Sequence, residues 1–207
     1  MKLYWSRRSP FARKALLVAH EAGLAERIEV ISIAIPQREP DPGLSEASPL
    51  QKLPTLITDD GDTIVDSPVI CEYLDRLAGG GLFPDGRDRW RAMSLQAIGD
   101  ELLSILLLWR AELRRPAELQ SEKLIGAHAA RLDRSLDWLE KQAEFSGEQP
   151  LHIGHITIGV LLSYLDFRFP ERDWRTGRNR LAQWQDDFMQ RPSALATGFS
   201  DQANARL

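Results

Sequence analysis

The hydrophobic pattern of the first third of the chain alternates between strand and helix periods. Residues 2–5 and 28–33 have the short apolar or alternating pattern of β-strands, and the second run reads Ile-Glu-Val-Ile-Ser-Ile. Between them, residues 10–22 are apolar around much of a helical circumference, which predicts a helix buried against a sheet. This order of strand, helix and strand predicts a parallel, right-handed β-α-β unit.

A proline-rich connection and a predicted β-hairpin come next. Prolines at 36, 40, 42 and 49, with a glycine at 43, predict a long irregular connection. Residues 53–58 and 63–65 flank the turn Asp59-Asp60-Gly61-Asp62, which is typical of a hairpin. Asp66-Ser67-Pro68 then predicts the start of a helix that stops at Gly79-Gly80-Gly81.

The rest of the chain shows only helical periods. Apolar residues recur at helical spacing over 88–114, over 117–145 and again in a later helix that carries Trp184. Residues 153–167 are apolar on almost every side, which predicts a central helix surrounded by others, and Ser193 is expected to cap a short final helix. Because the glycines at 79–81 are a natural linker, the sequence predicts an α/β domain over 1–81 and an all-α domain over 82–207.

The composition is that of an ordinary globular protein. Of 207 residues, 43% are hydrophobic and 27% charged, and the net charge of −4 argues against nucleic acid as the main partner. The longest apolar run, 156–162, is too short to span a membrane, and the N-terminus does not resemble a signal peptide, so we expect a cytoplasmic protein. The single cysteine, Cys71, excludes an intrachain disulfide and is interpreted as a buried packing thiol.

The break after the first strand is the first candidate for chemistry. Ser9 is a good N-cap residue, and Pro10 suits the first helical position that follows. Free N–H groups and the positive end of a helix dipole would meet at this point. The pattern therefore predicts a place where a negative charge is stabilised.

Four short motifs carry a resemblance to a known family. They are Ser9-Pro10-Phe11, the run 51–56 (Gln-Lys-Leu-Pro-Thr-Leu), the run 66–74 that begins Asp-Ser-Pro-Val-Ile, and Arg191-Pro192-Ser193. With these motifs and its order of elements, the chain resembles the glutathione transferases over essentially its whole length. The Ser-Pro-Phe motif is most similar to bacterial Ser-type and omega-like relatives. The resemblance implies a thioredoxin-like domain, an all-helical domain and a homodimer.

The resemblance also implies a glutathione site. The Ser67 hydroxyl and N–H would bind the γ-glutamyl carboxylate, and Asp66 would pair with the γ-glutamyl ammonium. A cis bond between Leu53 and Pro54 would let Leu53 pair with the cysteinyl backbone as an added strand does. The glycyl carboxylate would be met by one of two cations, Lys52 or Arg38.

Ser9 is the predicted partner of the glutathione thiolate. A serine hydroxyl is too weak an acid to serve as a base, so it would donate a hydrogen bond to sulfur, aided by the helix dipole and nearby arginines. Tyr4 and Ser6 stay open as alternatives. The site for the second substrate would be lined by residues of the helical half: Trp109, Arg110 and Tyr164.

The implied function is conjugation of glutathione, as a co-substrate, to a small hydrophobic electrophile, with no metal and a role in detoxification. Two alternatives stay open: a non-catalytic glutathione-binding interaction module, and a glutathione-dependent isomerase or dehalogenase. The chain departs from the family at the start of the central helix, where His152 and His155 replace the usual Ser or Thr and Asp. We interpret both histidines as neutral and structural, since a positive charge is unfavourable at a helix N-terminus.

Overall fold

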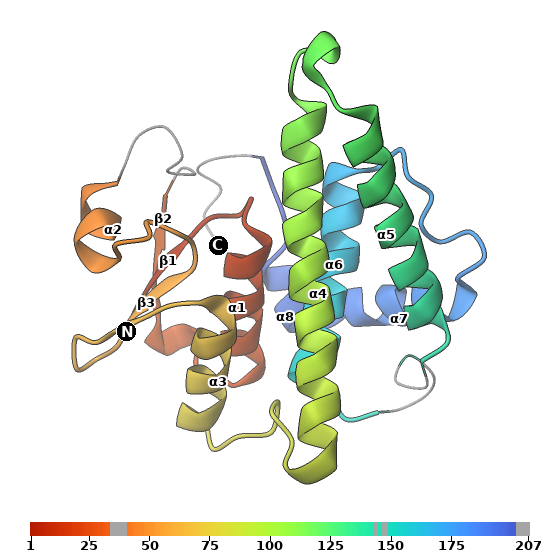
Figure 1. Ribbon diagram of the computed structural model, residues 1–207. Helices are drawn as coiled ribbons and strands as arrows, with labels where there is room; N and C mark the ends of the chain where they lie inside the picture. Colours follow the sequence, from red (N-terminus) through yellow and green to blue (C-terminus); the bar gives the residue numbers. More distant parts are fainter. Residues whose placement is uncertain (34–40, 143–144, 146–148, 202–207) are drawn as a thin grey trace.

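The computed structural model describes residues 1–33, 41–142, 145 and 149–201. A sheet with its helices forms one half of the molecule and a group of long helices forms the other (Figure 1). The sheet has the order β2-β1-β3-β4. Strand β1 (Lys2–Trp5) is parallel to β2 (Glu29–Ser32) and antiparallel to β3 (Thr55–Ile57), which pairs with β4 (Thr63–Ile64). The predicted β-α-β unit and hairpin are both confirmed.

Two helices lie beside the sheet and pack on each other, α1 (Pro10–Glu21) and α3 (Ser67–Leu77). A third, α2 (Pro42–Ala47), forms where we expected only irregular chain. Asp41 caps it by accepting a hydrogen bond from the Leu44 N–H at 2.8 Å, and Pro42 takes the first helical position. The proline content that argued against a helix therefore marks its start.

The second half contains the helices α4 (Gly86–Leu113), α5 (Glu122–Glu140), α6 (Ile153–Arg168), α7 (Asn179–Met189) and α8 (Pro192–Ala196). Short 3-10 turns occur at η1 (Ala25–Arg27) and η2 (Ala117–Leu119). The helix predicted over 117–145 is present as α5, but its predicted start is wrong, because η2 precedes a new start at which Ser121 caps α5. Ser193 does not cap α8 either. The cap position is Arg191, and the Ser193 hydroxyl donates to Glu21 of α1.

Helix α6 is central, as predicted, and every residue from Ile153 to Leu165 is buried. It packs most extensively on α4, and small residues allow the close approach. A Cβ added to Gly99 of α4 would lie 2.7 Å from the Thr157 side chain, and one added to Gly159 would lie 2.3 Å from the Phe188 ring of α7. Both distances are too short for ordinary packing, so these glycines determine how closely the helices meet.

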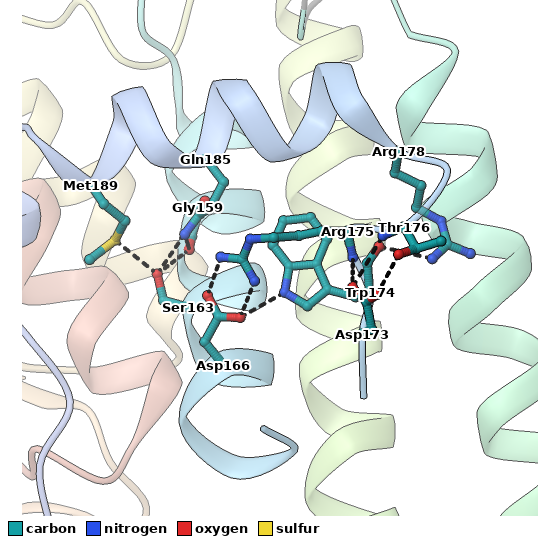
Figure 2. A network of polar contacts seen from close by, with 10 residues as sticks. All are labelled: Gly159, Ser163, Asp166, Asp173, Trp174, Arg175, Thr176, Arg178, Gln185 and Met189. Atoms are coloured by element: carbon teal, nitrogen blue, oxygen red, sulfur yellow. Dashed lines mark hydrogen bonds and ion pairs between the residues drawn. The ribbon is translucent and has the colours of Figure 1, made fainter. Parts of the chain in front are cut away.

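Polar contacts fix α6 against α7 and the segment before it (Figure 2). The Ser163 hydroxyl donates to the Gly159 carbonyl at 2.7 Å, and the Gln185 amide donates to that carbonyl and to the Ser163 oxygen. Asp166 accepts hydrogen bonds from the Trp174 indole and the Arg175 guanidinium. These contacts determine which face of α6 is turned toward α7.

Helix α4 is long and apolar enough to pass a length and hydropathy test for a membrane-spanning helix. Half of that apolar window is buried inside the protein, where α4 packs on α6 and α5. This is the environment of a core helix.

Candidate functional site

Five of the predicted glutathione-binding residues line one cavity of about 360 Å³ between the sheet half and α4. They are Lys52, Leu53, Pro54, Asp66 and Ser67. They come from the segment before β3 and from the start of α3, which β3 and β4 bring together. The sixth predicted residue, Arg38, lies outside the described residues. The peptide bond between Leu53 and Pro54 is cis, as the resemblance implied.

The start of α3 differs in one detail from the predicted arrangement. Asp66 is the N-cap residue, and its carboxylate accepts a hydrogen bond from the Ser67 N–H, which was predicted to bind the γ-glutamyl carboxylate. The Ser67 hydroxyl is buried and has no hydrogen-bond partner among the described residues. A buried polar group without a partner is costly, and a ligand in the cavity would supply one. The hydroxyl of Ser67, and not its N–H, is therefore the group available to a ligand.

The far wall of the cavity comes from α4 and includes Asp100 and Glu101, which sequence reasoning missed. The Lys14 ammonium of α1 donates to both carboxylate oxygens of Asp100 at 2.6 Å. The Lys14 side chain is fully buried. Burial raises the pKa of Asp100, and the Lys14 charge opposes this. The pair joins residues far apart in the chain, and no local signal in the sequence predicts it.

Ser9 does not line this cavity, although Phe11 of the same helix does. Ser9 is the N-cap of α1, as predicted, and its oxygen accepts a hydrogen bond from the Ala12 N–H at 3.2 Å. The hydroxyl proton is free to donate, because no described residue accepts it. The Ser6 hydroxyl is engaged by the Arg8 N–H at 3.4 Å, and the Tyr4 hydroxyl lies beside Gly43 of α2.

Comparison with known proteins assigns the family. Residues 8–77 match the glutathione S-transferase N-terminal domain, and residues 96–186 match the glutathione S-transferase C-terminal domain. The chain belongs to the glutathione S-transferase family. The order of strands and helices described above is accordingly the glutathione transferase fold, a thioredoxin-like half followed by an all-helical half.

Related proteins resemble the chain over nearly its whole length. It is 30% identical to the uncharacterized GST-like protein YibF of Escherichia coli (strain K12), over 95% of this chain and 98% of that one. A glutathione transferase family member from Pseudomonas fluorescens Pf-5 with bound glutathione is 35% identical with a TM-score of 0.89, covering 95% of this chain and 98% of that one. A second structure from that organism, with bound S-(propanoic acid)-glutathione, has the same coverage, 34% identity and a TM-score of 0.84.

The residues predicted for the second substrate of this glutathione S-transferase family member are separated by the fold. Arg110 of α4 and Tyr164 of α6 lie near each other. Burial raises the pKa of the Tyr164 hydroxyl, the nearby Arg110 charge opposes this shift, and the hydroxyl has no hydrogen-bond partner among the described residues. Trp109 does not join them. Its ring is only 3% exposed and packs on Phe169 and His128 at centroid distances of 5.0 and 6.4 Å. Trp109 is thus a core residue of the helical half.

Two other interpretations from the sequence are confirmed. Cys71 is fully buried in α3, and this burial raises the pKa of its thiol to about 12. His152 and His155 form a capping box of their own at the start of α6. The His152 Nδ1 accepts from the N–H of His155, and the His155 Nδ1 accepts from the N–H of His152, both at 3.4 Å. Burial lowers the pKa of both imidazoles, that of His155 to about 3, so they are neutral.

Proposed function

We propose that this protein is a glutathione transferase of the Ser-type or omega-like kind, which conjugates the glutathione thiolate to a small electrophile. The observation that carries the proposal is the cavity, whose lining includes five residues chosen from the sequence for glutathione binding. The Pseudomonas relative with bound glutathione supports it. The other structure, with a thioether of glutathione, contains the kind of compound that conjugation produces.

Each part of glutathione has a partner in this proposal. Asp66 pairs with the γ-glutamyl ammonium, and the Ser67 hydroxyl donates to the γ-glutamyl carboxylate. Leu53 pairs with the cysteinyl backbone, and Lys52, which is exposed at the cavity, meets the glycyl carboxylate. The thiolate sulfur then bonds to the electrophilic carbon. The electron pair that this carbon gives up departs with a leaving group or moves to a neighbouring atom that takes a proton.

We expect Asp66→Ala and Ser67→Ala each to weaken glutathione binding by about 1.5–3 kcal/mol, or about 10- to 150-fold. Each substitution removes a contact to a charged group of the ligand. Titration calorimetry measures the affinity, and circular dichroism checks that the fold persists. Asp60→Ala, in the exposed hairpin turn, is the matched control. Unchanged affinity in both variants would place the ligand elsewhere, and tight binding without turnover over a panel of electrophiles would favour a binding module.

Ser9→Ala tests the thiolate partner. If the Ser9 hydroxyl donates to sulfur, its removal raises the pKa of bound glutathione and lowers turnover, while the affinity for glutathione changes little. Since the α1 dipole still favours the thiolate, we expect a rise of about one pKa unit, equivalent to about 1.4 kcal/mol. The ultraviolet absorbance of the bound thiolate, titrated against pH, measures this directly. The same pKa in both proteins would return Ser6 or Tyr4 to consideration.

The proposal includes a cytoplasmic homodimer. Val69 of α3 and Trp90 of α4 are more than half exposed in the single chain, and burial of such apolar groups would stabilise a two-fold pair. Sedimentation velocity at micromolar protein concentration measures the oligomeric state. A monomer at that concentration would contradict this part of the proposal.

A further inference from the structure

Arginines gather next to Ser9, a residue that does not itself line the glutathione cavity. Arg7 and Arg8 directly precede Ser9, in the connection between β1 and α1. Arg168 at the end of α6 and Arg8 share the carboxylate of Asp201, which accepts from Arg168 at 2.8 Å and lies 3.4 Å from Arg8. Ser200 also donates its N–H to the Arg7 carbonyl at 3.5 Å. The segment around Asp201 therefore joins the end of α6 to the residues beside Ser9.

Arg110 of α4 completes this arginine cluster through Tyr164. Arg110 and Arg168 lie near Tyr164, whose side chain is fully buried and whose hydroxyl has no hydrogen-bond partner among the described residues. Ser163, the residue before Tyr164, belongs to the network that holds α6 against α7 (Figure 2). The cluster consists of Arg8, Arg110 and Arg168.

The charges in the cluster do not balance. Asp201 is the carboxylate that pairs with Arg8 and Arg168. Arg110 has no ion-pair partner in the part of the chain that the structure describes, although it is partly buried. Desolvation and the neighbouring charges of Arg168 and Arg114 lower the pKa of Arg110, while Asp201 and Tyr164 act in the opposite direction. A half-buried cation that lies among other cations is stabilised when an anion binds beside it.

We propose that Arg110 binds a carboxylate group of the electrophile that glutathione attacks. The inference rests on the glutathione transferase function proposed above and names its substrate class: small electrophiles that carry an anionic group. Arg110 is the member that suits this role, because it is accessible and not already paired, whereas Arg168 is largely buried and held by Asp201 in a two-point contact. A guanidinium presents parallel N–H donors that match the two oxygens of a carboxylate.

For an aryl chloride that bears a carboxylate, the proposed reaction is a substitution in which the glutathione sulfur replaces chloride. The thiolate sulfur forms a bond to the ring carbon that carries chlorine, and chloride departs with the electron pair of the broken bond. No oxidant, reductant or further reactant is needed. The carboxylate takes no part in the bond changes, so it serves only to hold the ring in place.

Binding of thioethers tests the inference without turnover. Calorimetry compares S-(2-carboxyethyl)glutathione with S-propylglutathione, which has a substituent of similar size without the charge. We expect the carboxylate form to bind about tenfold more tightly to the parent protein, and we expect Arg110→Gln to remove this preference while glutathione affinity stays unchanged. Arg131→Gln, an exposed arginine on α5, is the control with the same change of net charge.

Turnover gives a second measurement. With 4-chloro-3-nitrobenzoate, Arg110→Gln should lower kcat/KM about tenfold, whereas with the corresponding benzamide it should change kcat/KM less than twofold. Arg110→Lys should restore part of the loss, because it keeps the positive charge.

The possible failures are distinguishable. If the parent binds glutathione and both thioethers without preference, or if Arg110→Gln leaves the preference intact, the inference is wrong and the proposed function stands. If Arg110→Gln weakens glutathione itself, the arginine belongs to the glutathione site and the inference is again wrong. If the parent binds no glutathione at all, both the function and the inference are overturned.

Discussion

Asp100→Asn will lower the free energy of unfolding by about 3–5 kcal/mol, because it leaves the Lys14 ammonium buried without a counter-charge. Lys14 is fully buried between α1 and α4, and both oxygens of Asp100 lie 2.6 Å from its nitrogen. An amide cannot neutralise that charge. Urea denaturation of the parent and the variant at pH 7 measures the difference.

Two controls test whether the unpaired Lys14 ammonium causes this loss of stability. In the double variant Lys14→Met with Asp100→Asn the unpaired ammonium is gone, so most of the lost stability should return. Glu29→Gln breaks the exposed pair between Glu29 and Lys2 and should cost less than about 1 kcal/mol, because solvent screens that pair. A loss below 1 kcal/mol in Asp100→Asn, similar to that in Glu29→Gln, would show that Lys14 does not depend on its partner.

The second large effect is a loss of stability in acid that originates at the His155 side chain. Burial lowers the pKa of His155 to about 3 in the folded protein, against about 6.5 in an unfolded chain. The unfolded state therefore takes up the proton first as the pH falls. The contribution of neutral His155 to stability is present in full above about pH 6.5 and is lost, by about 1.4 kcal/mol per pH unit, as the pH falls toward 3. Between pH 6.5 and 4.5 we expect a loss of about 2–3 kcal/mol.

The matched variant replaces the histidine pair with the arrangement usual in the family, His152→Thr with His155→Asp. The side chains can still accept the hydrogen bonds that the two Nδ1 atoms accept now, but they take up no proton in this pH range. Urea denaturation at pH 6.5 and 4.5 measures both proteins. Equal losses of stability in the parent and the variant would contradict the assignment to the histidines.

Local signals predicted much of the fold and some of the site. The Ser9 cap, the hairpin around Asp59 to Asp62 and the central helix at 153–168 depend on interactions between residues a few positions apart. The same is true of the start of α3 at Asp66 and Ser67, although which of the two is the cap was not predicted. The boundary near residue 82 between two domains stays a prediction, as do the roles of the individual site residues.

The wrong predictions have local causes too. Proline and glycine at 42 and 43 were interpreted as irregular chain, but a proline in the first position of a helix that Asp41 caps favours that helix. The continuous helical period after 117 concealed the new start at Ser121. Ser193 has the chemistry of a cap, but its hydroxyl instead donates to Glu21, which also receives the Arg191 guanidinium at 2.8 Å.

The sequence by itself determined the order of the elements other than α2, the family resemblance and five of the residues that line the cavity, because those depend on short-range periodicity and on motifs. Only the tertiary structure decided which distant charges meet. Lys14 with Asp100, and Arg110 with Arg168 across Tyr164, are brought together by the packing of α1, α4 and α6. It also separated Trp109 from its neighbour Arg110, since adjacent residues on a helix face different directions. Such contacts depend on how helices pack, which no local pattern encodes.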